Sequence, residues 1–146
     1  GAAACAEGLL AGRRGTLTTA EELPMESDLR GIGPRTGVFV CHCGINIGGV
    51  VDVPAVVEYA KTLPNVVFAT DNLFTCSQDA AVKMAEAIQE HNLTRVVVAS
   101  CSPRTHEPLF QETIQEAGLN RYLFELANIH LPAQMFGYGE AGAWRG

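Results

Sequence analysis

Short apolar runs alternate with amphipathic segments from residue 37 to residue 127. Each run has the length and the β-branched content of a buried strand. Four strands are therefore predicted, at Val38–Cys41, Val66–Ala69, Arg95–Ser100 and Tyr122–Ala127. The third run is apolar on both faces, which is typical of a central strand in a parallel sheet.

The segments between the strands have the periodicity of amphipathic helices. Asp52 and Ser77 are predicted N-caps of the first two helices, and the third helix is predicted to begin at Thr105 or His106. Gly118 follows as the expected C′ residue of the third helix. The predicted inward positions are Val53, Val56, Val57, Ala60 and Leu63, then Ala81, Val82, Ala85 and Ile88, then Leu109, Phe110, Thr113, Ile114 and Ala117.

The alternation of strands and helices predicts the fold class and the division of the chain. Connections this short between strands require parallel pairing through right-handed crossovers. We therefore expect a three-layer α/β domain over residues 36–129, with a small parallel sheet flanked by helices, Rossmann-like or flavodoxin-like in shape. Residues 1–35 are predicted to be a flexible lead-in or the end of a preceding domain, and residues 130–146 an irregular tail.

Composition narrows the class of protein. The chain has 146 residues, 47% hydrophobic, and a formal net charge of −6, which fits one soluble domain and argues against a nucleic-acid surface. No apolar run approaches the ~20 residues that span a bilayer, and the first residues lack the order of a signal peptide. Five cysteines are too few for a disulfide scaffold in so apolar a chain. We therefore expect reduced thiols and a cytoplasmic location.

Four of the cysteines follow predicted strands. Cys41 and Cys43 close the first strand, Cys76 lies between the second strand and its helix, and Cys101 directly follows the third strand. In a parallel sheet all strand-to-helix loops leave from the same edge, so these thiols are predicted to meet at the carboxyl edge of the sheet. Cys5 lies apart in the lead-in and is interpreted as an incidental free thiol.

Thiols gathered at this edge are compatible with a metal centre. A [4Fe–4S] cluster takes four thiolates, and zinc accepts the same ligands. A helix N-terminus favours a thiolate, and glycines 44, 48 and 49 would let backbone amides approach sulfur. The alternative is that the cysteines are only small buried apolar residues. A lone Cys-x-Cys motif is weak, and the pattern by itself does not separate these possibilities.

Other polar residues at the predicted edge are candidates for a supporting role around the thiols. They are His42, Gly44, Ser77, Arg104 and His106. A histidine in such a loop is more often an ordinary polar residue than a ligand or a proton carrier. No catalytic residue is predicted.

Three other chemistries fit the sequence less well. Gly44-x-x-x-Gly48-Gly49 is not the dinucleotide fingerprint G-x-G-x-x-G. Ser102 lacks the nucleophile-elbow context of a hydrolase. A thiol–disulfide exchange enzyme is disfavoured because the chain has no C-x-x-C motif.

Over roughly Gly37 to Ile129 the chain resembles the A subunit of heterodisulfide reductase. The shared segments are Val38–Gly44, Asp52-Val53, Glu58–Lys61, Thr75–Ser77, Val96–Phe110, Glu116–Asn120 and Tyr122–Glu125. The resemblance is specific because several unusual sequence motifs occur in the same order. It indicates the amino-terminal type of module that this subunit places beside its flavin domain.

The resemblance implies an electron-transfer module of a flavin and iron–sulfur oxidoreductase from an anaerobic metabolism. It implies one [4Fe–4S] cluster on Cys41, Cys43, Cys76 and Cys101, and FAD elsewhere in the parent subunit. The implied partners are the flavin domain and other subunits of the complex. The module would perform no catalysis alone. The family has a further cysteine shortly after the match to Asn128-Ile129, where this chain continues with His130. A cluster-free docking domain or a zinc site is the alternative.

Overall fold

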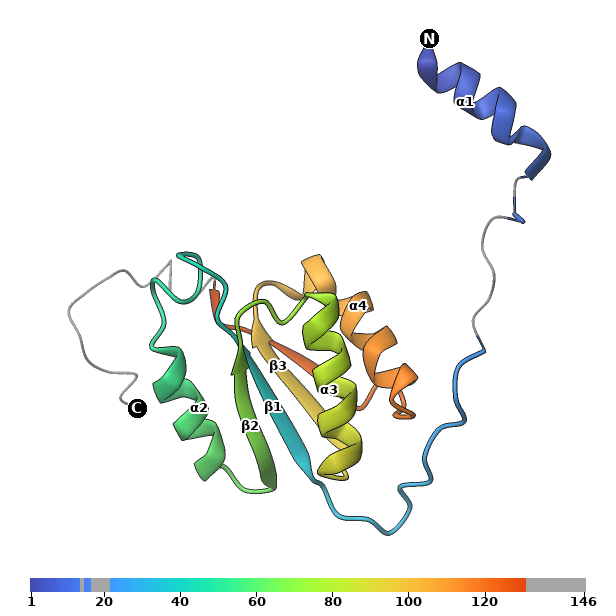
Figure 1. The fold of residues 1–146 in the computed structure, drawn as a ribbon. Coiled ribbons are helices and arrows are strands. Elements are labelled where there is room, and N and C mark those ends of the chain that lie inside the picture. Colours follow the sequence, from blue (N-terminus) through green and yellow to red (C-terminus); the bar gives the residue numbers. More distant parts are fainter. Residues whose placement is uncertain (14, 17–21, 131–146) are drawn as a thin grey trace.

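The computed structural model describes residues 1–13, 15–16 and 22–130. From residue 131 onward the predicted irregular tail lies outside the described residues. A parallel sheet forms the centre of the α/β module and consists of β1 (Thr36–Cys41), β2 (Val66–Asn72), β3 (Arg95–Ser100) and β4 (Phe124–Asn128). The strands are ordered β2-β1-β3-β4, and every pair is parallel (Figure 1).

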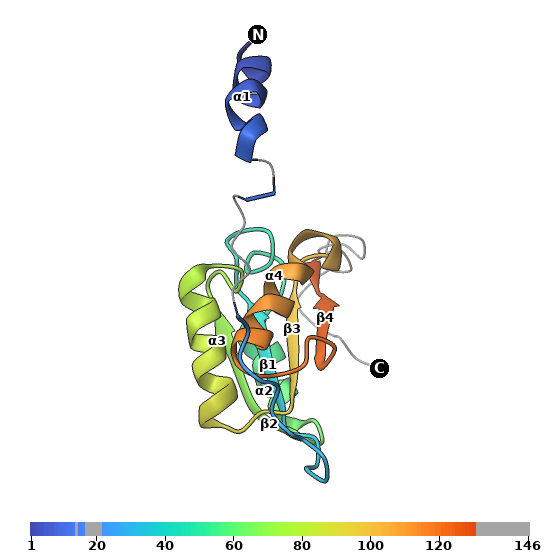
Figure 2. The same ribbon diagram turned by 90° about the vertical axis from the view of Figure 1, so that its right-hand side faces the viewer.

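Helices cover both faces of the sheet and complete the three predicted layers. Helix α2 (Val53–Thr62) covers one face, and α3 (Gln78–Glu90) and α4 (Pro103–Glu116) lie side by side on the other (Figure 2). Helix α1 (Ala2–Leu10) and the 3₁₀ helix η1 (Ala11–Arg13) precede the module, and no residue of either is buried. The three-layer α/β fold with a parallel sheet is therefore confirmed.

Each face of the sheet has its own hydrophobic core. Towards α3 and α4, Phe39 and Val98 pack with Met84, Phe110 and Ile114. The core towards α2 consists of Val38, Val40, Cys41, Ile47, Val53, Val57, Ala60 and Ala99. Strands β1 and β3 contribute to both cores because successive side chains of a strand point to opposite faces.

The helix starts follow the predicted capping chemistry, with one correction. Asp52 Oδ1 accepts a hydrogen bond from the Ala55 amide, and Ser77 Oγ accepts one from the Ala80 amide. Helix α4 begins at Pro103 instead of Thr105 or His106, and its N-cap is Ser102. Proline fits the first helical turn because its missing N–H has no partner there in any case.

Boundaries of three strands also differ from the prediction, and β1 begins two residues earlier, at Thr36. Strand β2 runs to Asn72 instead of ending at Ala69, because Thr70, Asp71 and Asn72 pair with β1. β2 is an edge strand, so polar residues are tolerated at its end while their backbone completes the ladder. Strand β4 begins at Phe124, and Tyr122 is exposed.

The inward face of α3 is partly wrong in the sequence-based prediction. Val82 is 50% exposed, whereas Ala80, Met84, Ala87 and Ile88 are buried. The buried positions are spaced four, three and one residues apart, which keeps them on one side of a helix. Val82 is apolar, but it lies two residues from both Ala80 and Met84 and therefore off the buried face of the helix.

Part of the lead-in packs on the α/β module. The Ser27 amide donates to the Gly118 carbonyl, and Leu29 packs against the core beneath α3 and α4. The Asn120 side-chain amide donates to both Glu26 carboxylate oxygens at 3.0 Å. The predicted division into lead-in, module and tail stays a prediction. Within the described ranges, no helix has the length and hydrophobicity needed to cross a bilayer.

The corrected face of α3 leads to a stability prediction. Met84→Ala removes a side chain with no exposed surface and should lower the free energy of unfolding by roughly 2–5 kcal/mol. Val82→Ala, two residues away on the exposed face, should change it by no more than about 0.5 kcal/mol. Urea unfolding of both variants measures this difference. Equal destabilisation by the two changes would show that the helix face is assigned wrongly.

Candidate functional site

The four candidate cysteines lie at the carboxyl ends of adjacent strands. Cys41 is the last residue of β1, and Cys43 follows two residues later. Cys101 comes directly after β3, and Cys76 lies in the loop between β2 and α3. Since β1 is hydrogen-bonded to both β2 and β3, all three strand ends meet at one edge. The crossover after β1 leads to β2 on one side and the crossover after β3 leads to β4 on the other, so the boundary between β1 and β3 is the point where ligands bind in open α/β sheets.

The thiols differ in exposure. Cys41 is buried, Cys43 and Cys101 are half-buried, and Cys76 is exposed. Cys5 is exposed on α1, outside the α/β module. The candidate set therefore runs from the interior to the surface of the same edge.

The electrostatics of the thiols link the four cysteines to one another. Burial raises the pKa of Cys43 to about 11, with further contributions from the charge on Cys41, a hydrogen bond between these two thiols and the charge on Cys101. The pKa of Cys76 is also raised, first by desolvation and then by the charges on Cys41 and Cys101. Charge on Cys41 or Cys101 thus disfavours ionisation of both Cys43 and Cys76.

The raised pKa values correct one expectation from the sequence. Cys76 lies just before α3, where the helix N-terminus was expected to favour the thiolate. Its own backbone N–H does lower the pKa, but desolvation and the neighbouring thiolates outweigh this effect. Desolvation is the largest cause although Cys76 is exposed, because nearby protein atoms still limit the hydration of its charge.

The described residues do not form a finished metal site. In residues 1–13, 15–16 and 22–130, no three or more His, Cys, Asp or Glu side chains are arranged so that they could hold a metal ion. The topology brings the four thiols to one edge, but it does not by itself test which of them are ligands. The ligand set therefore stays a prediction.

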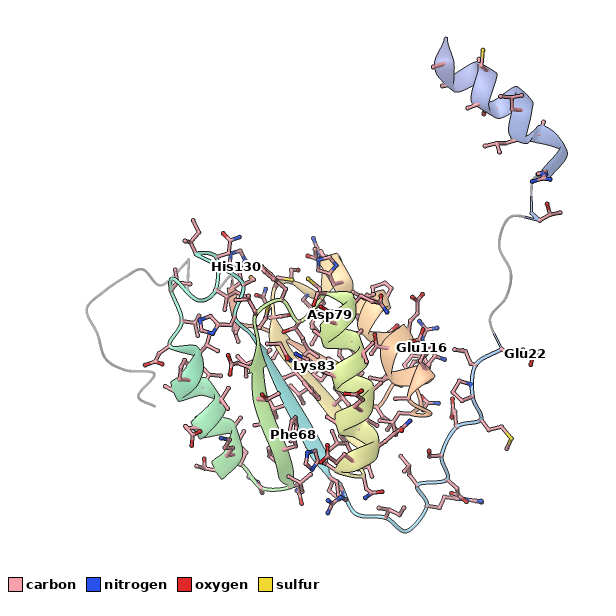
Figure 3. All side chains as sticks on the ribbon, in the orientation of Figure 1. Glu22, Phe68, Asp79, Lys83, Glu116 and His130 are labelled. Carbon is pink, nitrogen blue, oxygen red and sulfur yellow. The ribbon has the colours of Figure 1, made fainter. Side chains whose placement is uncertain are left out.

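Buried polar atoms without partners gather at the same edge. In the described part of the chain they are Asn72 Nδ2, Thr75 Oγ1, Ser100 Oγ and His130 Nε2. Asn72 is the last residue of β2, and Ser100 is the last residue of β3. His130 lies two residues after the end of β4 (Figure 3). A buried polar atom without a partner costs about 1–3 kcal/mol. Their concentration beside the cysteines fits a site that offers donors to a bound group.

The other predicted neighbours of the thiols have ordinary roles within the fold. His42 Nδ1 lies 3.3 Å from Asp71 Oδ2, and a Cβ on Gly48 would collide with the His42 ring. The Ser77 hydroxyl is occupied in capping α3. Arg104 and His106 lie in the first turn of α4, where Arg104 is exposed and His106 half-buried.

Two of the glycines after Cys43 are explained by close packing within their own turn. Gly44 has a φ of +39°, which favours glycine. A Cβ on Gly49 would lie 2.7 Å from the Ile45 carbonyl oxygen. The expected approach of these amides to sulfur is not needed to account for the glycines.

Sequence reasoning missed a repeated pattern around two of the cysteines. Thr75-Cys76-Ser77 precedes α3, and Ser100-Cys101-Ser102 precedes α4. In both, a hydroxyl residue is followed by a cysteine and then by the serine that caps the helix. The repetition was visible in the sequence, but the burial of the first hydroxyl residue was not.

Exposed apolar side chains flank the cysteines. Ile45 is 85% exposed two residues after Cys43, and Leu73 and Phe74 are 66% and 51% exposed just before Cys76. Large apolar side chains at a rim are common where another protein surface docks. We call Ile45, Leu73 and Phe74 the apolar rim.

Known proteins similar to this chain carry consistent names. The A subunit of H(2):CoB-CoM heterodisulfide,ferredoxin reductase from Methanothermobacter marburgensis is 57% identical over 96 residues, which are 66% of this chain and 15% of that protein. Methanopyrus kandleri has two iron-sulfur A subunits of CoB–CoM heterodisulfide reductase among the relatives. The one numbered 2 is also 57% identical over 96 residues, which are 66% of this chain and 15% of that protein. The iron-sulfur A subunit of CoB–CoM heterodisulfide reductase from Methanocaldococcus jannaschii is 51% identical over 98 residues, 67% of this chain and 15% of its own length.

The similarity confirms the resemblance seen in the sequence. It shows that this chain is like a fragment of the heterodisulfide reductase A subunit. The chain spans about 15% of the length of the curated relatives it matches. No protein-family model matches the chain.

The pKa of Cys43 predicts slow alkylation of the ligand-free chain. At pH 8 a thiol with a pKa of about 11 is about 100-fold less ionised than one with a pKa of 9.0. Cys43 should therefore react about 100-fold more slowly with iodoacetamide in the folded chain than in urea. The difference should shrink as the pH rises towards 11. Mass spectrometry of the Cys43 peptide measures both rates, and equal rates at pH 8 would contradict the prediction.

Proposed function

Since about two thirds of this chain are homologous to a segment of the heterodisulfide reductase A subunit, we propose that it is an electron-transfer module of such an oxidoreductase. The module holds a [4Fe–4S] cluster at the carboxyl edge of its sheet. Cys41, Cys43, Cys76 and Cys101 are the proposed ligands. The observation that carries the proposal is the position of all four cysteines at or after the carboxyl ends of adjacent strands, with Cys43 and Cys76 influenced by the same two other cysteines.

The donor set fits such a cluster. Four thiolates and nearby hydrogen-bond donors are what a [4Fe–4S] cluster takes from a protein. The buried unpartnered hydroxyls of Thr75 and Ser100 supply donors beside Cys76 and Cys101. Three of the relatives are named iron-sulfur subunits, which supports iron over other metals.

Proton release accompanies binding. Before anything binds, desolvation and the charges on Cys41 and Cys101 raise the pKa of Cys43 and of Cys76, so both thiols are protonated near neutral pH. Both must lose their protons to become ligands, because only thiolates coordinate metals. The positive charge of bound iron would then attract the cysteine thiolates, which would otherwise repel one another. A bound cluster would supply one-electron transfer, and the chain's residues would hold it, exclude water from its inner side and donate hydrogen bonds.

We further propose that the apolar rim docks the rest of the parent protein. FAD is expected in the parent's flavin domain and not in this module. That flavin domain and other subunits are the proposed partners. The rim residues are exposed and lie within three residues of Cys43 or Cys76 in the chain, so a partner seated on them would help to shield these thiols from water.

A cluster-free docking domain is the second candidate function. The apolar rim favours it, and the four thiols would then be structural or would bind zinc. Iron, sulfide and zinc analysis of protein purified without oxygen separates the possibilities.

The test of the cluster proposal is reconstitution of the whole 146-residue chain with iron and sulfide under anaerobic conditions. We expect about four irons per chain and a broad absorbance near ~400 nm. Cys76→Ser and Cys101→Ser should each lower the iron content and bleach this band. Cys5→Ser is the matched control and should bind iron as the parent does, because Cys5 is exposed on α1.

Full iron binding by both Cys76→Ser and Cys101→Ser would overturn the ligand set. Bound zinc with no iron or sulfide in the parent chain would instead favour the structural alternative.

A further inference from the structure

We propose that the hydroxyls of Thr75 and Ser100 donate hydrogen bonds to sulfur atoms of the bound cluster and thereby raise its reduction potential. The inference rests on the proposed function and deepens it. It assigns a role to two residues that are not proposed ligands and that each directly precede a proposed ligand in the chain.

Burial without a partner is the first observation. Thr75 and Ser100 are only 1% and 2% exposed, and neither hydroxyl has a hydrogen-bond partner among the residues that the structure describes. A buried hydroxyl in that state is costly, so native proteins nearly always satisfy it. Something outside the described residues therefore has to complete these two groups.

The chain contains its own comparison. Thr94 and Thr113 are equally buried, at 3% and 4% exposed, but both hydroxyls are satisfied. Thr94 Oγ1 accepts from the Arg35 amide at 2.8 Å, and Thr113 Oγ1 donates to the Leu109 carbonyl at 3.0 Å. Thr94 lies at the opposite, amino edge of the sheet and Thr113 inside α4. The unsatisfied hydroxyls are those beside the cysteines.

The repeated pattern before α3 and α4 is the second observation. Thr75 directly precedes Cys76, and Ser100 directly precedes Cys101. The serines on the other side of each cysteine, Ser77 and Ser102, already accept hydrogen bonds from the helix amides. At each of these two positions, the hydroxyl that precedes the proposed ligand is therefore the one without a hydrogen-bond partner among the described residues.

The chemistry of sulfur decides which role the hydroxyls take. Thiolate and sulfide atoms accept hydrogen bonds but do not donate them, so each hydroxyl acts as the donor. Donation to sulfur stabilises the reduced cluster more than the oxidised one, because the reduced form carries one more negative charge. Hydrogen bonds to the sulfurs are among the factors that set cluster potentials.

The experiment compares variants that remove a hydroxyl and keep the shape. Thr75→Val and Ser100→Ala are made in the whole chain, reconstituted anaerobically, and titrated for reduction potential by electron paramagnetic resonance. We expect parent-like iron content and a shift of the midpoint potential to more negative values in both. Thr75→Ser keeps the donor and should keep the parent potential.

Thr113→Val is the matched control. It removes a buried hydroxyl of the same kind, but one bonded to the Leu109 carbonyl away from the cysteines, so the potential should not move. Unfolding of the ligand-free chain is a second readout. Thr113→Val loses a hydrogen bond and should destabilise the chain, whereas Thr75→Val removes an unsatisfied group and should not.

The outcomes separate this inference from the proposed function. If the parent chain binds no iron and sulfide, the proposed function fails. If it binds them and both Thr75→Val and Ser100→Ala keep the parent potential, the cluster stands and the hydroxyls serve another group, such as a buried water. Loss of iron in Thr75→Val with retention in Thr75→Ser supports the contact. Loss in both, with an unchanged potential in Ser100→Ala, overturns it.

Discussion

Parallel pairing of β1 with both β2 and β3 is the constraint on which the rest of this structure depends. It places β1 in the middle of the sheet and sends the crossovers through α2 to one face and through α3 to the other. Three loops that are distant along the chain then leave from adjacent strand ends. Both cores and the candidate site follow from this arrangement, because β1 and β3 contribute side chains to each core and end at Cys41 and Ser100.

The two ends of the sheet differ in how completely their polar groups are satisfied. At the amino edge, the Arg35 side chain donates to the carbonyls of His91 and Asn92, and the Arg35 amide donates to the Thr94 hydroxyl. At the carboxyl edge, Thr75 and Ser100 are buried without partners among the described residues. Satisfied polar groups at one edge and unsatisfied ones at the other are typical of a binding site, where function outweighs local stability.

The size of the chain relative to its relatives gives the site its context. The chain spans about 15% of their length. Ile45, Leu73 and Phe74 are exposed and lie close in sequence to Cys43 and Cys76. In our proposal the module supplies the inner wall of the site, and the remaining protein supplies the outer one.

The sequence by itself determined the features that depend on local patterns. Apolar periodicity predicted the strands and helices, Asp52 and Ser77 predicted two helix starts, and the short connections predicted a parallel sheet with Cys41, Cys43, Cys76 and Cys101 after its strands. Only the tertiary structure decided the strand order, the exposed position of Val82, the start of α4 at Pro103 and the raised pKa of Cys76. Hydrophobic pattern and capping act between residues near in sequence. Burial, hydrogen-bond satisfaction and charge repulsion depend on groups that the fold brings together from distant segments.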